Sequence, residues 1–168
     1  MATQRGDSGA PRSDGRCPVC LAPGAVGAPC AAPGCAHRGL HAIPWDAAED
    51  VGADPFIGHL LDDYLIVARI GRGGFGSVYL ALQRPLFTLR AAIKVLNAVD
   101  GDPQVRTTLL RKFEGEAQAL SVLTHPNIVR LLKYGHADDR PFLVMEYVEG
   151  SRTLRAAAAA HADAGGHV

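Results

Sequence analysis

The stretch IGRGGFGSVYLA, residues Ile70–Ala81, is the most informative part of the sequence about the fold. Four glycines, Gly71, Gly73, Gly74 and Gly76, stand directly before a run of β-branched, aromatic and aliphatic residues. Backbone without Cβ atoms approaches phosphate closely, and the N–H groups of such a turn donate to anionic oxygens. The alternative is a tight hairpin turn that needs glycine only for positive φ. Either way, two strands joined by a glycine-rich turn are expected.

The flanking segments predict a small antiparallel sheet. YLIVARI and SVYLAL flank the glycines, RAAIKVL follows as a third strand, and NIVRLLKYG and PFLVMEYV, separated by the turn-like HADDR, form two more. Between them, Val105–Leu123 has helical periodicity, with Phe113, Ala117, Leu120 and Leu123 on one face that we expect to be buried. Short links between neighbouring strands favour an α+β fold, with a five-stranded antiparallel sheet and one helix packed on it.

A Rossmann dinucleotide-binding unit shares the glycine pattern but fails two requirements. It needs a helix directly after the glycines and an acidic residue about 20 positions on, which binds ribose. Here a strand-like segment follows, and no Asp or Glu occurs from Ser77 to Val99.

Four motifs in order match a different pattern. GRGGFGSV fits GxGxxGxV, AAIKVL places Lys94 sixteen residues after Val78, FEGEAQALSVLTHPNIVRLLKYG carries Glu116, and PFLVMEYVEG follows. The sequence resembles the N-terminal lobe of a protein kinase, and more narrowly that of bacterial relatives of the eukaryotic serine/threonine kinases. Ala91 replaces the usual Val of the VAIK motif.

The resemblance implies a role for each matching residue. The glycines cover the ATP triphosphate, Lys94 pairs with the α- and β-phosphates while Glu116 holds its ammonium, and Met145 is the gatekeeper of the adenine pocket. Lys94 and Glu116 are thus the implied catalytic pair. The implied nucleotide contacts are Ile70, Gly71, Gly73, Gly74, Gly76, Val78, Ala92, Lys94, Met145, Glu146 and Val148.

The groups of the second kinase lobe do not occur in these 168 residues. The resemblance places the catalytic Asp of HRD and the Mg²⁺-binding Asp of DFG in that C-lobe, and neither motif is present. We therefore expect no phosphoryl transfer by this chain alone. We also expect an apolar patch of Leu120, Leu131, Leu143 and Met145 where the C-lobe normally packs.

All four cysteines fall within one short segment. Cys17 and Cys20 form CxxC, and after nine intervening residues Cys30 and Cys35 form CxxxxC, with His37 two positions further on. This clustering in a reducing compartment favours a zinc-ribbon-like Zn²⁺ site, in which Cys35 or His37 is the fourth ligand. The alternative is a set of free thiols in a disordered arm. We expect His41 and Trp45 to be packing or linker residues rather than ligands.

Composition divides the chain into five parts. We expect a disordered leader (1–15), the zinc-ribbon-like segment (16–44), an acidic linker (45–58), the kinase N-lobe with its hinge (59–150) and a low-complexity Ala-rich tail (151–168). Lys+Arg and Asp+Glu balance at 17 each, no run of about 18 apolar residues occurs, and the N-terminal residues have no hydrophobic core that could serve as a signal peptide. We therefore expect a cytoplasmic chain with no nucleic-acid partner and no membrane segment.

Two functions fit these observations. The first is the ATP-binding lobe of a serine/threonine protein kinase, using ATP, Mg²⁺ and Zn²⁺, with protein substrates that the sequence does not identify. The second is a non-catalytic, zinc-dependent interaction module with a vestigial kinase half-lobe.

Overall fold

The structure is a computed structural model that describes residues 14–47, 54–97, 102–137 and 140–150. The expected leader up to residue 13, residues 48–53 of the expected linker and the Ala-rich tail lie outside the described residues.

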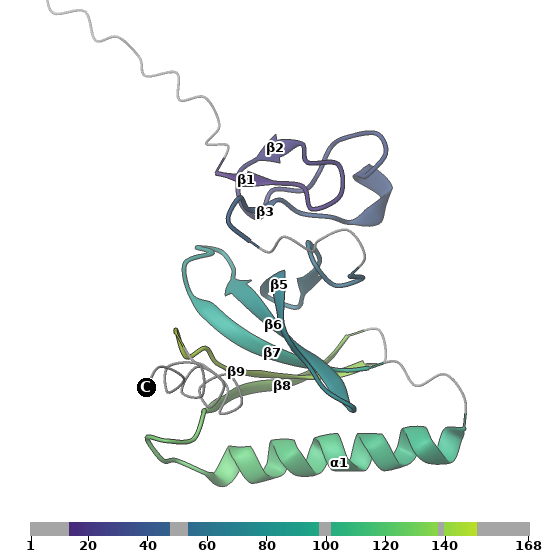
Figure 1. The fold of residues 1–168 in the computed structure, drawn as a ribbon, viewed down its shortest axis with the longest axis vertical. Helices are drawn as coiled ribbons and strands as arrows, with labels where there is room; N and C mark the ends of the chain where they lie inside the picture. The colour runs from purple at the N-terminus through teal and green to yellow at the C-terminus, as the bar shows by residue number, and fades with distance from the viewer. Residues whose placement is uncertain (1–13, 48–53, 98–101, 138–139, 151–168) are drawn as a thin grey trace, which may run out of the picture.

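A six-stranded antiparallel sheet forms the larger part of the fold (Figure 1). In spatial order its strands are β4 (Leu60–Leu61), β5 (Tyr64–Arg72), β6 (Gly76–Gln83), β7 (Arg90–Leu96), β9 (Arg140–Glu146) and β8 (Leu131–Ala137). The five expected strands are present, and the two-residue β4 adds a sixth at the edge beside β5. Strand β8 begins later than the expected position 127, because His125 and Asn127 form a turn in which the Asn127 amide donates to His125 Nδ1 at 3.1 Å.

One helix, α1 (Pro103–Val122), packs on this sheet. Its start follows the usual capping chemistry: Asp102 accepts a hydrogen bond from the Gln104 amide at 2.8 Å, and Pro103 occupies the first turn. Phe113 and Ala117 of the helix are buried against Leu143 and Leu96 of the sheet.

The burial differs from the sequence expectation at two places. Leu123 is 44% exposed, because α1 ends at Val122 and the chain turns to an extended conformation there. Leu143, expected in an exposed patch, is fully buried, because α1 itself covers it. Leu120, Leu131 and Met145 are half-buried.

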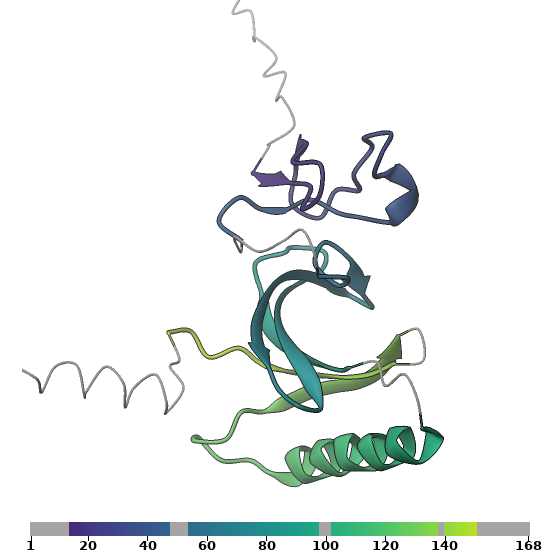
Figure 2. The same ribbon diagram turned by 45° about the vertical axis from the view of Figure 1, so that its right-hand side comes forward.

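A second sheet forms the Cys-rich segment, with β2 (Pro23–Gly24), β1 (Gly15–Arg16) and β3 (Ile43–Pro44) in that spatial order, and a short helix η1 (Ala36–Arg38). In Figures 1 and 2 this segment lies at one end of the large sheet and α1 at the other. Its Ile43 is fully buried in the main core of the lobe, which also contains Ile57. The end of the expected linker is therefore packed rather than solvated.

Asp54, three residues before the buried Ile57, bonds to two strands of the large sheet. Its side chain is only 3% exposed and accepts hydrogen bonds from Arg69 at 3.0 Å, Tyr79 Oη at 3.3 Å and the Phe56 amide at 3.0 Å. The pKa of the Tyr79 hydroxyl is raised, chiefly by burial and secondly by the negative charge of Asp54. A buried carboxylate with three donors holds β5, β6 and the preceding segment together.

We predict that Asp54→Ala lowers the free energy of unfolding by about 2 kcal/mol, because three donors lose a buried acceptor. Asp46→Ala, which removes an exposed carboxylate, is the control and should change stability by less than about 0.5 kcal/mol. Urea unfolding of both variants measures the difference, and equal stabilities would refute the assignment.

Candidate functional site

The glycine-rich turn joins β5 to β6 and is closed by a hydrogen bond from the Gly73 amide to the Gly76 carbonyl at 2.9 Å. None of its glycines is among the positive-φ residues of the described chain. A requirement for positive φ therefore does not explain the four glycines.

Packing explains only one of them. A Cβ at Gly76 would lie 2.5 Å from the Val95 carbonyl oxygen, so the neighbouring strand excludes any side chain there. A Cβ at Gly74 would meet nothing within 4 Å, and at Gly73 and Gly71 the nearest atoms lie at 3.8 and 3.6 Å. Three glycines thus leave open space that the fold does not need, as expected for backbone that a ligand approaches.

Asn97, which sequence reasoning missed, supports the turn from the end of β7. Its backbone amide donates to the Phe75 carbonyl at 3.2 Å. In its side chain, Nδ2 donates to the Gly73 carbonyl at 3.4 Å and Oδ1 accepts from Ser77 Oγ at 3.1 Å. The available signal was a polar residue directly after the apolar strand AAIKVL.

The Lys94 ammonium lies against the Glu116 carboxylate, with Nζ 2.8 Å from Oε1 and 2.5 Å from Oε2. Lys94 comes from the middle of β7 and Glu116 from α1, and their side chains are 21% and 40% exposed. The ring of Phe113 lies 5.8 Å from Lys94 Nζ. A charged amine is therefore held at a fixed place, still partly open to solvent, on the same face of the sheet as the helix.

The expected adenine contacts share that face. Ala92 lies opposite Met145 on β9, and Val78 lies opposite Lys94, so strand pairing gathers these four side chains on one side of the sheet. Ala92 is buried, and Val78 and Met145 are half-buried.

The expected hinge contacts and Ile70 lie at the margin of this face. Ile70 and Val148 are 47% and 48% exposed. The Glu146 amide donates to the Arg130 carbonyl at 3.0 Å, so Glu146 has only its carbonyl left for a base.

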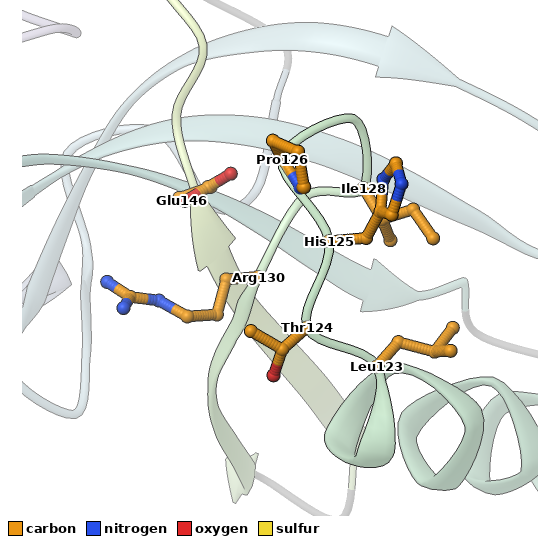
Figure 3. Close-up of a pocket in the computed structure, with 7 residues that line it drawn as sticks. All are labelled: Leu123, Thr124, His125, Pro126, Ile128, Arg130 and Glu146. Atoms are coloured by element: carbon orange, nitrogen blue, oxygen red, sulfur yellow. The ribbon is translucent and has the colours of Figure 1, made fainter.

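A hollow of about 360 Å³ lies between the end of α1 and the end of β9 (Figure 3). It is lined by Leu123, Thr124, His125, Pro126, Ile128, Arg130 and Glu146. Of the expected nucleotide contacts only Glu146 lines it, so this hollow is not the adenine site.

The four cysteines converge on one point. The Sγ atoms of Cys17, Cys20, Cys30 and Cys35 all lie within 4.8 Å of one another, and those of Cys20 and Cys30 are 3.6 Å apart. Four thiolates around tetrahedral Zn²⁺, with Zn–S distances of about 2.3 Å, have sulfurs about 3.8 Å apart. The donor set and its spacing therefore fit zinc. His37 lies exposed on η1 and is not part of this group.

The pKa values of Cys20, Cys30 and Cys35 are shifted in different directions. The pKa of Cys20 is lowered to about 7, chiefly by a hydrogen bond from the Ala22 backbone, whereas burial raises the pKa of Cys35 to about 12. Burial also raises the pKa of Cys30. Cys20 is thus more readily deprotonated than Cys30 or Cys35 in the metal-free chain.

The sequence pattern of the protein kinase domain family matches residues 64–163, more than half of the chain. The chain belongs to the protein kinase family. The serine/threonine-protein kinase Pkn1 of Myxococcus xanthus is 35% identical over 98 residues, and the serine/threonine-protein kinase PrkC of Bacillus subtilis is 42% identical over 87 residues. These alignments cover 58% and 52% of this kinase chain, but only 14% and 13% of the relatives' lengths.

The fold agrees with this membership. The solved structure described as "PpkA-294 apo form" superposes with a TM-score of 0.56 at 23% identity, covering 64% of this chain and 43% of that one. No helix within the described ranges is long and apolar enough to cross a membrane.

We predict that Gly76→Ala destabilises the fold and that Gly74→Ala leaves its stability nearly unchanged. Gly76→Ala should lower the free energy of unfolding by about 1–3 kcal/mol, because its Cβ collides with the backbone of β7. Gly74→Ala should change it by less than about 0.5 kcal/mol, because its Cβ has free space. Thermal or urea unfolding compares the two, and a larger loss for Gly74→Ala would contradict this description of the turn.

Proposed function

We propose that this chain supplies the ATP-binding half of a serine/threonine protein kinase. The observation that carries the proposal is the Lys94–Glu116 ion pair on the sheet face that also presents Val78, Ala92 and Met145. An ammonium fixed by a carboxylate beside an open glycine turn is preorganised for a polyphosphate.

Each group has a distinct task in this proposal. Lys94 neutralises phosphate charge, Glu116 orients the ammonium, and the open backbone of Gly73 and Gly74 lies over the phosphates. Val78, Ala92 and Met145 supply apolar contacts to the adenine, and the hinge backbone supplies hydrogen bonds.

Transfer of the γ-phosphoryl to a Ser or Thr hydroxyl further requires a base for the hydroxyl and Mg²⁺ ligands. In the protein kinase family both come from the HRD and DFG motifs, which do not occur in this sequence. We propose serine/threonine specificity because the relatives Pkn1 and PrkC are serine/threonine kinases by name. The chain alone is proposed to bind nucleotide without transferring phosphate.

We further propose that the Cys-rich segment binds one Zn²⁺ through its four cysteines, with Cys35 rather than His37 as the fourth ligand. The buried Cys35 Sγ lies in the cluster, and His37 lies exposed. The segment's own core holds only Cys17, Cys35 and Leu40 as buried members. Structural zinc contributes roughly 10–16 kcal/mol of apparent binding free energy in small peptides at pH 7, far more than such a core supplies.

We predict that Lys94→Ala weakens ATP binding at least about tenfold, because the phosphates lose a charge-assisted partner. Lys133→Ala is the matched control, since Lys133 also lies on a strand of the same sheet in an ion pair, with Asp62. Competition against a fluorescent ATP analogue measures both affinities. Equal loss in the two variants, or no ATP binding by the parent chain, would reject the nucleotide site.

We predict one zinc per chain, lost in Cys35→Ser and retained in His37→Ala. Elemental analysis of protein purified under reducing conditions gives the stoichiometry. Loss of zinc in His37→Ala would make the histidine a ligand and overturn the four-cysteine assignment.

A further inference from the structure

We infer that metal binding at the four cysteines controls the order of β5, the strand that carries the glycine-rich turn, and thereby couples zinc to nucleotide affinity. The inference rests on the zinc and ATP sites proposed above and concerns their regulation. Three contacts within the described residues connect the two sites.

The first contact is a joint at Gly58. Pro18, inside the Cys17–Cys20 turn, packs so closely on Gly58 that a Cβ there would lie 2.5 Å from Pro18 Cγ. The Gly58 carbonyl accepts from the His41 amide of the Cys-rich segment at 2.7 Å, and the Gly58 amide donates to the Ile66 carbonyl of β5 at 2.9 Å. Gly58 thus bonds to both parts, six positions before β5 begins at Tyr64, and it lies directly against a turn that holds two metal ligands.

The second contact is a shared hydrophobic core. Ile43 of β3 is fully buried among Ile57, Leu65 and Val67, which belong to the kinase lobe. On the other side, the ring of Phe87, from the link between β6 and β7, lies against Gly27, where a Cβ would be 2.2 Å from the ring. The Cys-rich segment therefore covers part of the core that β5 and β6 need.

The third contact is the Asp54 carboxylate, which binds Arg69 of β5 and Tyr79 of β6. Arg69 lies two residues before Gly71 and pairs directly with Tyr79 across the two strands. Asp54, four residues before Gly58, is thereby bonded close to the base of the glycine-rich turn.

Metal is what keeps the first two contacts in place. The Cys-rich segment consists of three two-residue strands around a core of three buried residues, too little to hold its shape alone. Without metal the Cys17–Cys20 turn is not fixed, Pro18 no longer presses on Gly58, and Ile43 leaves the core beside β5. On the opposite face of the sheet, Phe113 of α1 packs with Leu143 of β9 in a separate cluster that the Cys-rich segment does not join.

The test is amide hydrogen exchange of the full chain, zinc-loaded and after removal of zinc by a chelator under reducing conditions. We expect exchange at Leu65, Ile66 and Val67 to accelerate at least about tenfold on metal removal, and exchange at Phe113 and Ala117 by less than about twofold. ATP affinity, measured on the same samples, should fall at least about fivefold.

Two glycine variants make the test specific. Gly58 and Gly39 both have positive φ, +84° and +63°, but a Cβ at Gly39 meets nothing within 4 Å. Gly58→Ala should keep its zinc yet show fast β5 exchange even when loaded, whereas Gly39→Ala should behave like the parent chain.

The outcomes separate this inference from the proposals beneath it. Complete zinc loss with unchanged β5 exchange overturns the coupling and leaves the metal site standing. Equal acceleration in β5 and α1 also overturns it, because the metal would then stabilise the whole lobe. A chain that never takes up zinc overturns both the metal site and the coupling. A failure of ATP binding alone overturns the nucleotide site and its coupling to zinc, and the exchange result then decides only whether the metal controls the order of β5.

Discussion

The arrangement of the candidate site depends on the ion pair between Lys94 and Glu116. The lysine comes from the middle of the sheet and the glutamate from α1, so their contact requires the helix to lie at one position along the strand. The Phe113, Ala117 and Leu143 cluster sets that position by apolar packing. Apolar packing therefore provides the stability that places the charged pair. The pair itself contributes little, because both side chains are partly exposed to solvent.

The glycines show how stability and binding divide within one turn. Gly76 is required by the approach of β7, while the space outside Gly73 and Gly74 is left open. Since the fold alone does not require glycine at these two positions, their presence supports a role in ligand approach. Gly58, like Gly76, is required by the fold. It has a positive φ, it lies against Pro18, and its backbone joins the Cys-rich segment to β5.

Local patterns predicted the sheet, the helix and the cysteine cluster, because period-two and helical spacing and turn residues are written in consecutive positions. What they missed depends on contacts between distant positions. Leu143 is apolar in either case, and only the placement of α1 shows that it is buried. The sequence predicts Asp54 to be a solvated acid of the linker, and only the structure shows that it accepts hydrogen bonds from Arg69 and Tyr79. The proposal that Cys35 and not His37 is the fourth zinc ligand likewise depends on the fold, which places the Cys35 side chain in the cluster and leaves His37 on η1 outside it.

We propose that the residues of this chain form the nucleotide half-site without contacts from a second lobe. Titration of the zinc-loaded chain with Mg·ATP, followed by the backbone amide NMR signals of Gly73, Gly76 and Lys94, tests it most directly. We expect saturable shifts at these three residues, with little change at Lys133 on the edge strand β8. A folded, zinc-loaded chain whose signals do not move at millimolar ATP would contradict it.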